Sequence, residues 1–182
     1  VHVVHEAIPQ EFLDAADSVT ETEEAQIIDQ LILNRPYIFF VGTREPRKNL
    51  VRLIEAWQDL APEYDLLIAG SEGWDESDIT AQSFKYQPRF LGRVTDKTLS
   101  VLYANAQVFA FPSLYEGFGL PILESFHHGT PVVTSNNSGM VEVAGNAAEI
   151  VDPESVESIK TGIQKILSET PEEQKKRLQR MI

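Results

Sequence analysis

The chain of 182 residues is 42% hydrophobic, which is enough apolar material for one globular domain with a sizeable core. Its net charge of -13 argues against broad binding to nucleic acid or to an anionic membrane, because both partners need a basic protein face. The absence of cysteine excludes disulfides, thiolate zinc sites and a thiol nucleophile. The first residue is Val1 rather than Met, and we expect a fragment of a longer protein.

Residues 1–36 are expected to be an interdomain link that carries a leading helix. Residues 1–4 are expected as a short strand and residues 8–12 as a turn. A helix is predicted over residues 22–33, because acids fill its first turn and apolar residues recur behind them. The domain proper is expected over residues 37–182.

Six short apolar runs, bounded by glycine, proline or polar residues, predict strands, and the runs at residues 37–41 and 108–111 predict buried ones. They lie at residues 37–41, 64–69, 88–91, 108–111, 131–134 and 148–151. Amphipathic segments between them predict helices from residue 50, up to Phe84, from residue 96, over 120–128 and 140–145, from residue 153 and from residue 171. Their expected N-caps are Asn49, Thr95 or Asp96, Asp152 and Thr170. This alternation predicts an α/β fold with a doubly wound, Rossmann-like parallel sheet.

In such a fold ligands bind beyond the carboxyl ends of the strands. Four loops are expected at that edge, over residues 42–48, 70–74, 92–94 and 112–119. The first loop carries Arg44, Arg47 and Lys48, which is a dense group of cations for so acidic a chain. These side chains can supply charge-assisted hydrogen bonds to a diphosphate, although surface lysine and arginine are also common without a function.

The segment from Phe111 to Glu124 is the most informative part of the sequence. It passes from a predicted strand through a glycine loop into a helix, whose free N–H groups and partial positive charge suit a phosphate. Glu116 precedes the loop glycines and Glu124 lies one turn into the helix. Carboxylates accept hydrogen bonds from hydroxyls, so this arrangement predicts a site for a nucleotide or a nucleotide-sugar.

Several other kinds of site are disfavoured by the sequence. No phosphate-binding loop ending in Gly-Lys-Ser/Thr, no Gly-x-Gly-x-x-Gly after the first strand and no Gly-x-Ser-x-Gly elbow is present. The four histidines lack metal-ligand spacing, and no metal site is predicted. His127 and His128 are expected at the solvated end of a helix, where positive charge is favoured.

Three blocks of sequence, residues 41–49, 90–99 and 111–135, resemble a known family. The third block contains a Glu-x₇-Glu motif from Glu116 to Glu124. Together the blocks resemble the C-terminal, donor-binding domain of the retaining GT-B glycosyltransferases of family four, and the resemblance runs over about residues 37–166. It implies one half of a GT-B fold, with the N-terminal acceptor domain absent and the C-terminus truncated.

For the diphosphate, the resemblance implies that Lys48 contacts the donor phosphates. Many relatives carry an arginine directly after the loop glycine, where this chain has Thr43. Arg44 or Arg47 is the expected substitute for that arginine. Lys48 and Glu116 are the residues that the resemblance marks as catalytic.

For the rest of the donor, the resemblance assigns the base to the backbone around Arg93 and Val94. Glu124 accepts hydrogen bonds from the ribose hydroxyls in this assignment. Glu116 holds the transferred sugar and the phosphate together with three backbone N–H groups, those of Phe118, Gly119 and Leu120.

The activity implied is retaining transfer of a hexose, with mannose favoured, from a GDP- or UDP-linked donor to a saccharide or lipid-linked acceptor. No metal or cofactor is expected, and the acceptor is expected to bind the missing N-terminal domain. The implied location is cytoplasmic, with the full-length protein at the inner face of a membrane, and the fragment alone is expected to bind donor weakly and to transfer little. The alternatives are a GT-B epimerase or phosphorylase, or a non-catalytic nucleotide-binding domain, since fold does not fix function.

Overall fold

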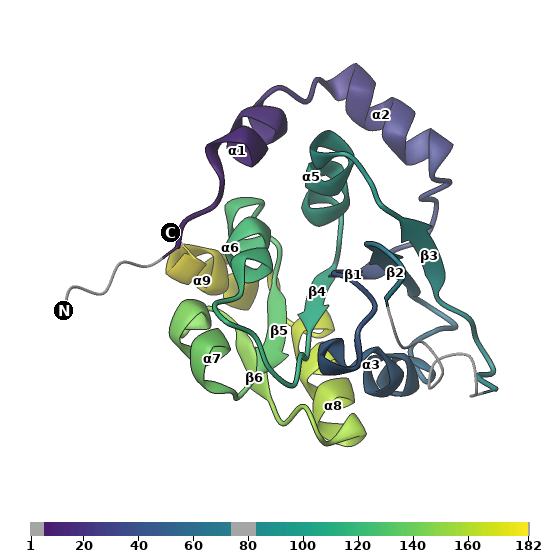
Figure 1. The fold of residues 1–182 in the computed structure, drawn as a ribbon, viewed down its shortest axis with the longest axis vertical. Helices are drawn as coiled ribbons and strands as arrows, with labels where there is room; N and C mark the ends of the chain where they lie inside the picture. Colours follow the sequence, from purple (N-terminus) through teal and green to yellow (C-terminus); the bar gives the residue numbers. More distant parts are fainter. Residues whose placement is uncertain (1–5, 74–82, 182) are drawn as a thin grey trace.

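The computed structural model describes residues 6–73 and 83–181, which form a parallel six-stranded sheet with helices on both faces (Figure 1). The strand order is β3-β2-β1-β4-β5-β6, so the sheet is doubly wound from its central pair as predicted. The strands are β1 (Tyr37–Val41), β2 (Asp65–Ala69), β3 (Arg89–Gly92), β4 (Val108–Phe111), β5 (Val132–Ser135) and β6 (Glu149–Val151).

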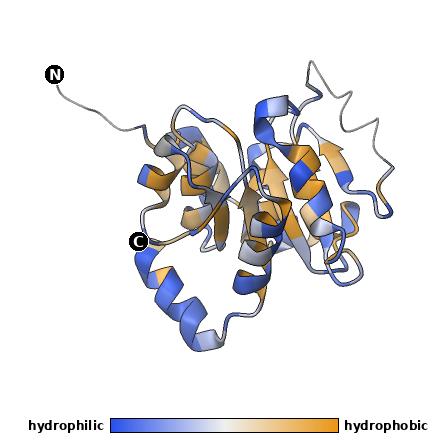
Figure 2. Cartoon of the chain, turned by 90° about the horizontal axis from the view of Figure 1, so that it is seen from below, coloured by the Kyte–Doolittle hydropathy of each residue, from blue (hydrophilic) through white to orange (hydrophobic). Residues whose placement is uncertain are grey.

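The central strands are buried because both of their faces are covered by helices. Strand β4 is buried along its whole length, and β1 pairs with it through Ile38 opposite Val108 and Phe39 opposite Phe109. In Figure 2 the strands form a hydrophobic layer between helices whose outward faces are hydrophilic. Each apolar run of the sequence has therefore become a strand of this layer.

The described helices and the 3-10 turn η1 lie between these strands or flank them. They are α1 (Gln10–Asp17), α2 (Glu21–Gln30), η1 (Pro46–Lys48), α3 (Leu50–Trp57), α5 (Asp96–Ala104), α6 (Leu120–His127), α7 (Ser138–Ala144), α8 (Val156–Leu167) and α9 (Pro171–Met181). Helices α3 and α8 pack against each other, and α5 packs beside α6. Helices α1 and α2 arch over α5, so the described part of the leading segment lies against the domain (Figure 1).

Some local predictions are wrong. Residues 8–12, expected as a turn, contain the start of α1, where Pro9 occupies the N-cap position and Phe12 is buried. Helix α8 is capped by Ser155, whose hydroxyl accepts from the N–H of Ser158, and not by Asp152.

Other caps behave differently from one another. Asn49 precedes α3 as predicted, but it has φ 60° and ψ 32° and its side chain makes no cap hydrogen bond. Thr95 and Thr170 confirm their predicted roles, because each hydroxyl accepts from a first-turn N–H. The strand predicted at residues 1–4 and most of the weak helix before Phe84 lie outside the described residues.

Candidate functional site

The four predicted loops meet at the carboxyl edge of the sheet, because parallel strands all end on one side. Backbone hydrogen bonds join them: the N–H of Gly42 donates to Ala69, and that of Gly70 donates to Gly92. A Cβ atom on Gly70, whose φ is +126°, would lie 2.1 Å from the carbonyl oxygen of Gly42. Only glycine therefore allows the loops after β1 and β2 to approach this closely.

Lys48 and Glu116 form the centre of this edge. Lys48 ends the short η1 turn and is only 7% exposed, with its Nζ 2.7 Å from Oε1 of Glu116. The same ammonium lies 4.8 Å from the ring centroid of Phe111, at the end of β4. Arg47 contacts the other oxygen of Glu116, with Nη1 2.7 Å from Oε2. The Glu116 carboxylate is thus bound between two cations that lie far from it in the sequence.

Arg44, the third cation of the loop, lies towards β3. Its guanidinium carbon is 4.7 Å from the ring centroid of Phe90, and its Nη2 is 3.2 Å from Glu72. The three predicted cations therefore separate into a pair beside Glu116 and a single arginine above Phe90. Arg47 therefore contacts Glu116, whereas Arg44 contacts Phe90 and Glu72 instead.

Asn49 joins the loops of this site through its side chain, a role that the sequence did not reveal. Its side-chain amide donates to the carbonyl of Pro112 at 2.9 Å and to that of Pro153 at 2.7 Å. The N–H of Leu114 also donates to the carbonyl of Arg47. The loops after β1, β4 and β6 are therefore fixed to one another, which holds Lys48 and Glu116 in register.

Helix α6 begins at Leu120, four residues after Glu116 in the sequence. Gly119 occupies its N-cap position with φ +109° and, as a glycine, has no side chain to cap the helix. Its first turn carries Leu120 and Pro121, and Pro121 has no N–H to offer. The predicted donors at Phe118, Gly119 and Leu120 thus lie in and just before the first turn of this helix.

Glu124 lies one turn further into α6 and faces α5. Its Oε2 accepts a 2.9 Å hydrogen bond from the hydroxyl of Tyr103. Burial raises the pKa of Glu124, the Tyr103 hydrogen bond opposes that rise, and the negative charge of Asp96 adds to it. Burial, followed by the charge of Glu124, raises the pKa of Tyr103 well above its usual value, so the phenol is a permanent donor at neutral pH.

Arg93 and Val94 connect β3 to the N-cap residue of α5. Arg93 is exposed, whereas Val94 is half-buried and packs against the core. Asp96, the first residue of α5, is close enough to act electrostatically on Glu124. The predicted base loop therefore leads into α5, the helix whose Tyr103 contacts the predicted ribose carboxylate.

The histidine prediction is half wrong. His127 is exposed, but His128 is half-buried and stacks on Tyr103 with ring centroids 5.6 Å apart. Its Nδ1 lies 2.8 Å from the carbonyl oxygen of Glu124, which can only accept, so Nδ1 carries the hydrogen and Nε2 accepts from Ser100 at 2.7 Å. Within the described ranges, no group of three His, Cys, Asp or Glu side chains is placed to hold a metal ion.

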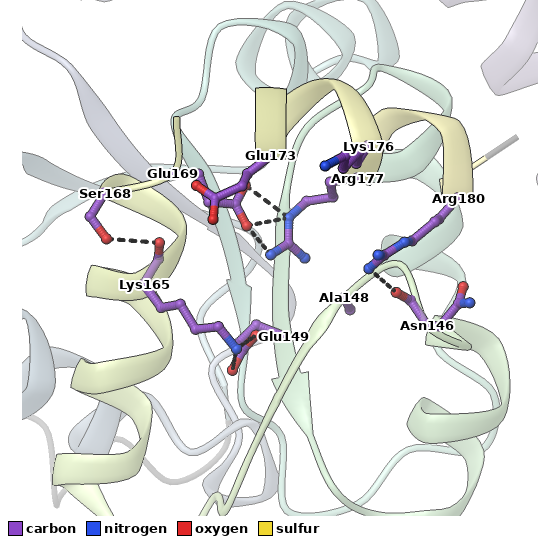
Figure 3. A pocket seen from close by; sticks show the side chains of 10 residues that line it. All are labelled: Asn146, Ala148, Glu149, Lys165, Ser168, Glu169, Glu173, Lys176, Arg177 and Arg180. Carbon is purple, nitrogen blue, oxygen red and sulfur yellow. Dashed lines mark hydrogen bonds and ion pairs between the residues drawn. The ribbon is translucent and has the colours of Figure 1, made fainter. Parts of the chain in front are cut away.

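A separate polar pocket of about 350 Å³ lies between α8, α9 and the start of β6 (Figure 3). Its lining is dominated by internal pairs, because Arg177 contacts Glu169 and Lys165 contacts Glu149 at 2.7 Å. Glu149 begins β6, so this pocket lies at the amino edge of the sheet, opposite the loops described above. We therefore assign it a structural role in docking α9.

Comparisons with known structures define the class of protein. The chain superposes on sucrose-phosphate synthase from Thermosynechococcus elongatus with a TM-score of 0.70 and 26% identity, over 86% of this chain and 44% of that one. It superposes on Anabaena HepE, solved in complex with UDP and glucose, with a TM-score of 0.74 and 20% identity, over 88% and 46% of the two chains. The fold is that of one Rossmann-like half of a GT-B glycosyltransferase, as the resemblance implied.

The sequence comparisons give the family. The model of the family described as glycosyl transferases group 1 matches residues 21–181, so the chain belongs to that family. It is also 43% identical over 136 residues to O-antigen chain mannosyltransferase B of Escherichia coli. That match covers 70% of this chain and 35% of the relative, so the chain spans about a third of the relative's length.

Proposed function

We propose that this chain is the donor-binding domain of a glycosyltransferase that transfers a hexose from a nucleoside diphosphate sugar, with retention and without a metal or cofactor. The observation that carries the proposal is the joint placement of Lys48, Arg47 and Glu116 at the N-terminus of α6. Glu124 follows one turn later and faces α5, the helix that the Arg93–Val94 loop precedes. The same edge thus offers cations, backbone donors and carboxylate acceptors, which match phosphates and hydroxyls.

The diphosphate would lie between the loop after β1 and the start of α6. Lys48 and Arg47 supply positive charge there, and the backbone N–H groups of Phe118, Gly119 and Leu120 supply donors. When the bond between the sugar and the phosphate breaks, negative charge grows on the departing diphosphate. Lys48, held in a nearly buried position, is suited to stabilise that charge.

The remaining parts of the donor extend to either side of the diphosphate. Glu124 accepts from the ribose hydroxyls, and the backbone of Arg93 and Val94 holds the base. Glu116 faces the transferred sugar and accepts from its hydroxyls. Arg44, above Phe90, would border the nucleoside side of the site.

Mannose is the proposed sugar, with GDP-mannose as the first candidate donor. Support comes from the relative of Escherichia coli, whose name describes a mannosyltransferase acting on an O-antigen chain. The structure of HepE contains UDP, so UDP-linked hexoses are the second candidates. The acceptor would be a saccharide or lipid-linked saccharide held by an N-terminal domain outside this chain.

We further propose a cytoplasmic site of action at the inner face of a membrane for the full-length protein. In the part of the chain that the structure describes, no helix is both long and apolar enough to cross a bilayer. Peripheral attachment of the full-length protein is part of this proposal. Fractionation of the full-length protein with and without high salt tests this, because peripheral contacts weaken as salt rises.

The test of the proposed function is calorimetric titration of the chain with GDP- and UDP-linked hexoses. Lys48→Ala and Glu124→Ala are each expected to weaken binding by tenfold or more, on the order of the loss of one hydrogen bond to a charged group. Lys97→Ala is the matched control, because Lys97 is also ion-paired at 2.7 Å but contacts Glu23 on α2. A chain that binds no nucleotide would favour a non-catalytic interaction domain on the same fold, and rapid transfer by the isolated chain would refute the need for a second domain.

A further inference from the structure

Tyr103 is a fully buried tyrosine whose hydroxyl reaches towards the candidate site. It lies on α5 among the rings of Phe12, Phe39, Phe109 and His128, with centroid distances from 5.1 to 6.5 Å. Its backbone carbonyl also accepts a 2.6 Å hydrogen bond from Thr130. Packing on this scale fixes the phenol in one rotamer, so its hydroxyl has a defined position.

The hydroxyl of Tyr103 donates to Oε2 of Glu124 at 2.9 Å. Among the described residues, the other carboxylate oxygen of Glu124, Oε1, has no hydrogen-bond partner. One oxygen is thus held by the protein, and the second remains open to a ligand. A glutamate side chain has three rotatable bonds, and fixing it before binding lowers the entropy cost of the contact that it then makes.

We propose that Tyr103 is a positioning residue for nucleotide recognition, which holds the Glu124 carboxylate so that Oε1 accepts from a ribose hydroxyl. This inference rests on the proposed function, since it needs a ribose at Glu124. Tyr103 itself, fully buried beneath α6, contacts no ligand in this arrangement. The leading helix α1 takes part through Phe12, whose ring meets Tyr103 edge-on at 6.5 Å.

The charged surroundings of Glu124 make the Tyr103 contact more important. On α5, Asp96 acts on the carboxylate with a like charge, and on α6 the ring of His128 is bonded to the backbone carbonyl of Glu124. Asp17 of α1 acts in turn on His128. The Tyr103 hydroxyl is the group that favours the ionised form of Glu124 in this setting.

The test compares Tyr103→Phe with the wild-type chain in titrations with UDP and GDP and with their 2′,3′-dideoxy forms. The variant keeps the ring and removes only the hydroxyl. We expect about tenfold weaker binding of the ribonucleotides, the usual loss for one hydrogen bond to a charged group, and less than about a twofold change for the dideoxy forms. Equal weakening of both kinds of ligand would show a general structural role and overturn the inference, as would no weakening of either.

Tyr37→Phe is the matched control. Tyr37 is also buried, and its hydroxyl donates at 2.9 Å to the backbone carbonyl of Leu102 on the same helix. It loses a comparable buried hydrogen bond without touching Glu124. It is expected to lower the melting temperature without distinguishing ribonucleotides from dideoxy forms.

A ligand-free measurement separates this inference from the proposed function. The carboxyl carbon of Glu124, followed by NMR through a pH titration, reports its pKa directly. Tyr103→Phe is expected to raise that pKa further, and Tyr37→Phe to leave it unchanged, since only Tyr103 stabilises the carboxylate. A wild-type chain that binds no nucleotide refutes the proposed function and removes the role assigned to Tyr103, whereas an unchanged Glu124 pKa in Tyr103→Phe refutes the positioning contact alone.

Discussion

The ion pairs of Glu116 predict that removing its charge strengthens the binding of a bare nucleoside diphosphate. In the ligand-free chain its carboxylate binds both Lys48 and Arg47, which are the cations proposed for the diphosphate. A bare nucleoside diphosphate must therefore compete with Glu116 for them. Replacing Glu116 by glutamine removes the competing charge and keeps the shape of the side chain, so Glu116→Gln is expected to bind UDP and GDP more tightly.

The burial of the two pairs sets the size of the effect. The side chains of Glu116 and Lys48 are 11% and 8% exposed, whereas that of Arg47 is 43% exposed. The Arg47 pair is thus screened by solvent and contributes at most about 1 kcal/mol. A hydrogen bond between charged groups that are sheltered from solvent contributes about 1.5–3 kcal/mol. Glu116→Gln relieves the diphosphate of displacing part of the Lys48 contact, so we expect it to raise the affinity for UDP and GDP roughly tenfold.

Calorimetric titration with UDP and GDP at fixed ionic strength measures this effect. Glu45→Gln is the matched control, because Glu45 pairs with Arg47 at 2.7 Å in the same loop but does not contact Lys48. It is expected to change affinity by less than about twofold, as for an exposed pair. If Glu116→Gln instead weakens bare diphosphates as Lys48→Ala does, Glu116 is a ligand of the nucleotide and the competition argument is wrong.

Three further predictions concern stability. Arg177→Met is expected to lower the free energy of unfolding in urea by about 3 kcal/mol, because it leaves the nearly buried Glu169 carboxylate without its partner. Adding Glu169→Leu to this variant should restore most of that loss. Lys176→Met, which breaks an exposed pair on the same helix, should cost less than about 0.5 kcal/mol, and an equal loss would refute the burial argument. Burial lowers the pKa of His128, so as the pH falls the unfolded chain takes up the histidine proton at a higher pH than the folded chain does. The free energy of unfolding should therefore decrease as the pH drops through the usual histidine range. His128→Gln should make the free energy of unfolding less dependent on pH in that range. Burial raises the pKa of Glu124, so ionisation of this side chain costs stability once the pH exceeds the pKa that it has in the unfolded chain. Glu124→Gln should therefore raise the melting temperature at pH 7 by about 2–4 °C while weakening ribonucleotide binding. A lower melting temperature would contradict this.

The strands were predictable because their signal is local. Each is a short apolar run ended by glycine, proline or a polar residue, and β1 and β4 agree with the prediction residue for residue. Helix α1 was missed for the opposite reason. Its amphipathic character is short, and Phe12 is buried only because α1 packs on Tyr103 and His128 from a distant part of the chain.

The site shows the same division between local and distant information. The sequence placed Lys48 and Glu116 at one edge, but their direct contact spans 68 positions and has no local signature. Asn49 carries the pattern of a helix cap, yet its amide bonds carbonyls 63 and 104 positions away. Tyr103 falls within a predicted helix, but nothing local in the sequence shows where its hydroxyl points.

The two carboxylates of the Glu-x₇-Glu motif lie in opposite electrostatic settings, and this difference bears on how a donor would bind. Glu116 is neutralised by two cations, so a diphosphate can exchange with it. Glu124 is desolvated, faces the charge of Asp96 and is held by a neutral hydroxyl, which costs stability but leaves one oxygen ready for a ligand. Under the proposed assignment, the nucleoside side of the site would therefore be formed in advance, and the diphosphate side would be masked until a ligand releases Glu116. A released Glu116 would then stand beside the phosphate that carries the sugar, where a hydroxyl acceptor is needed.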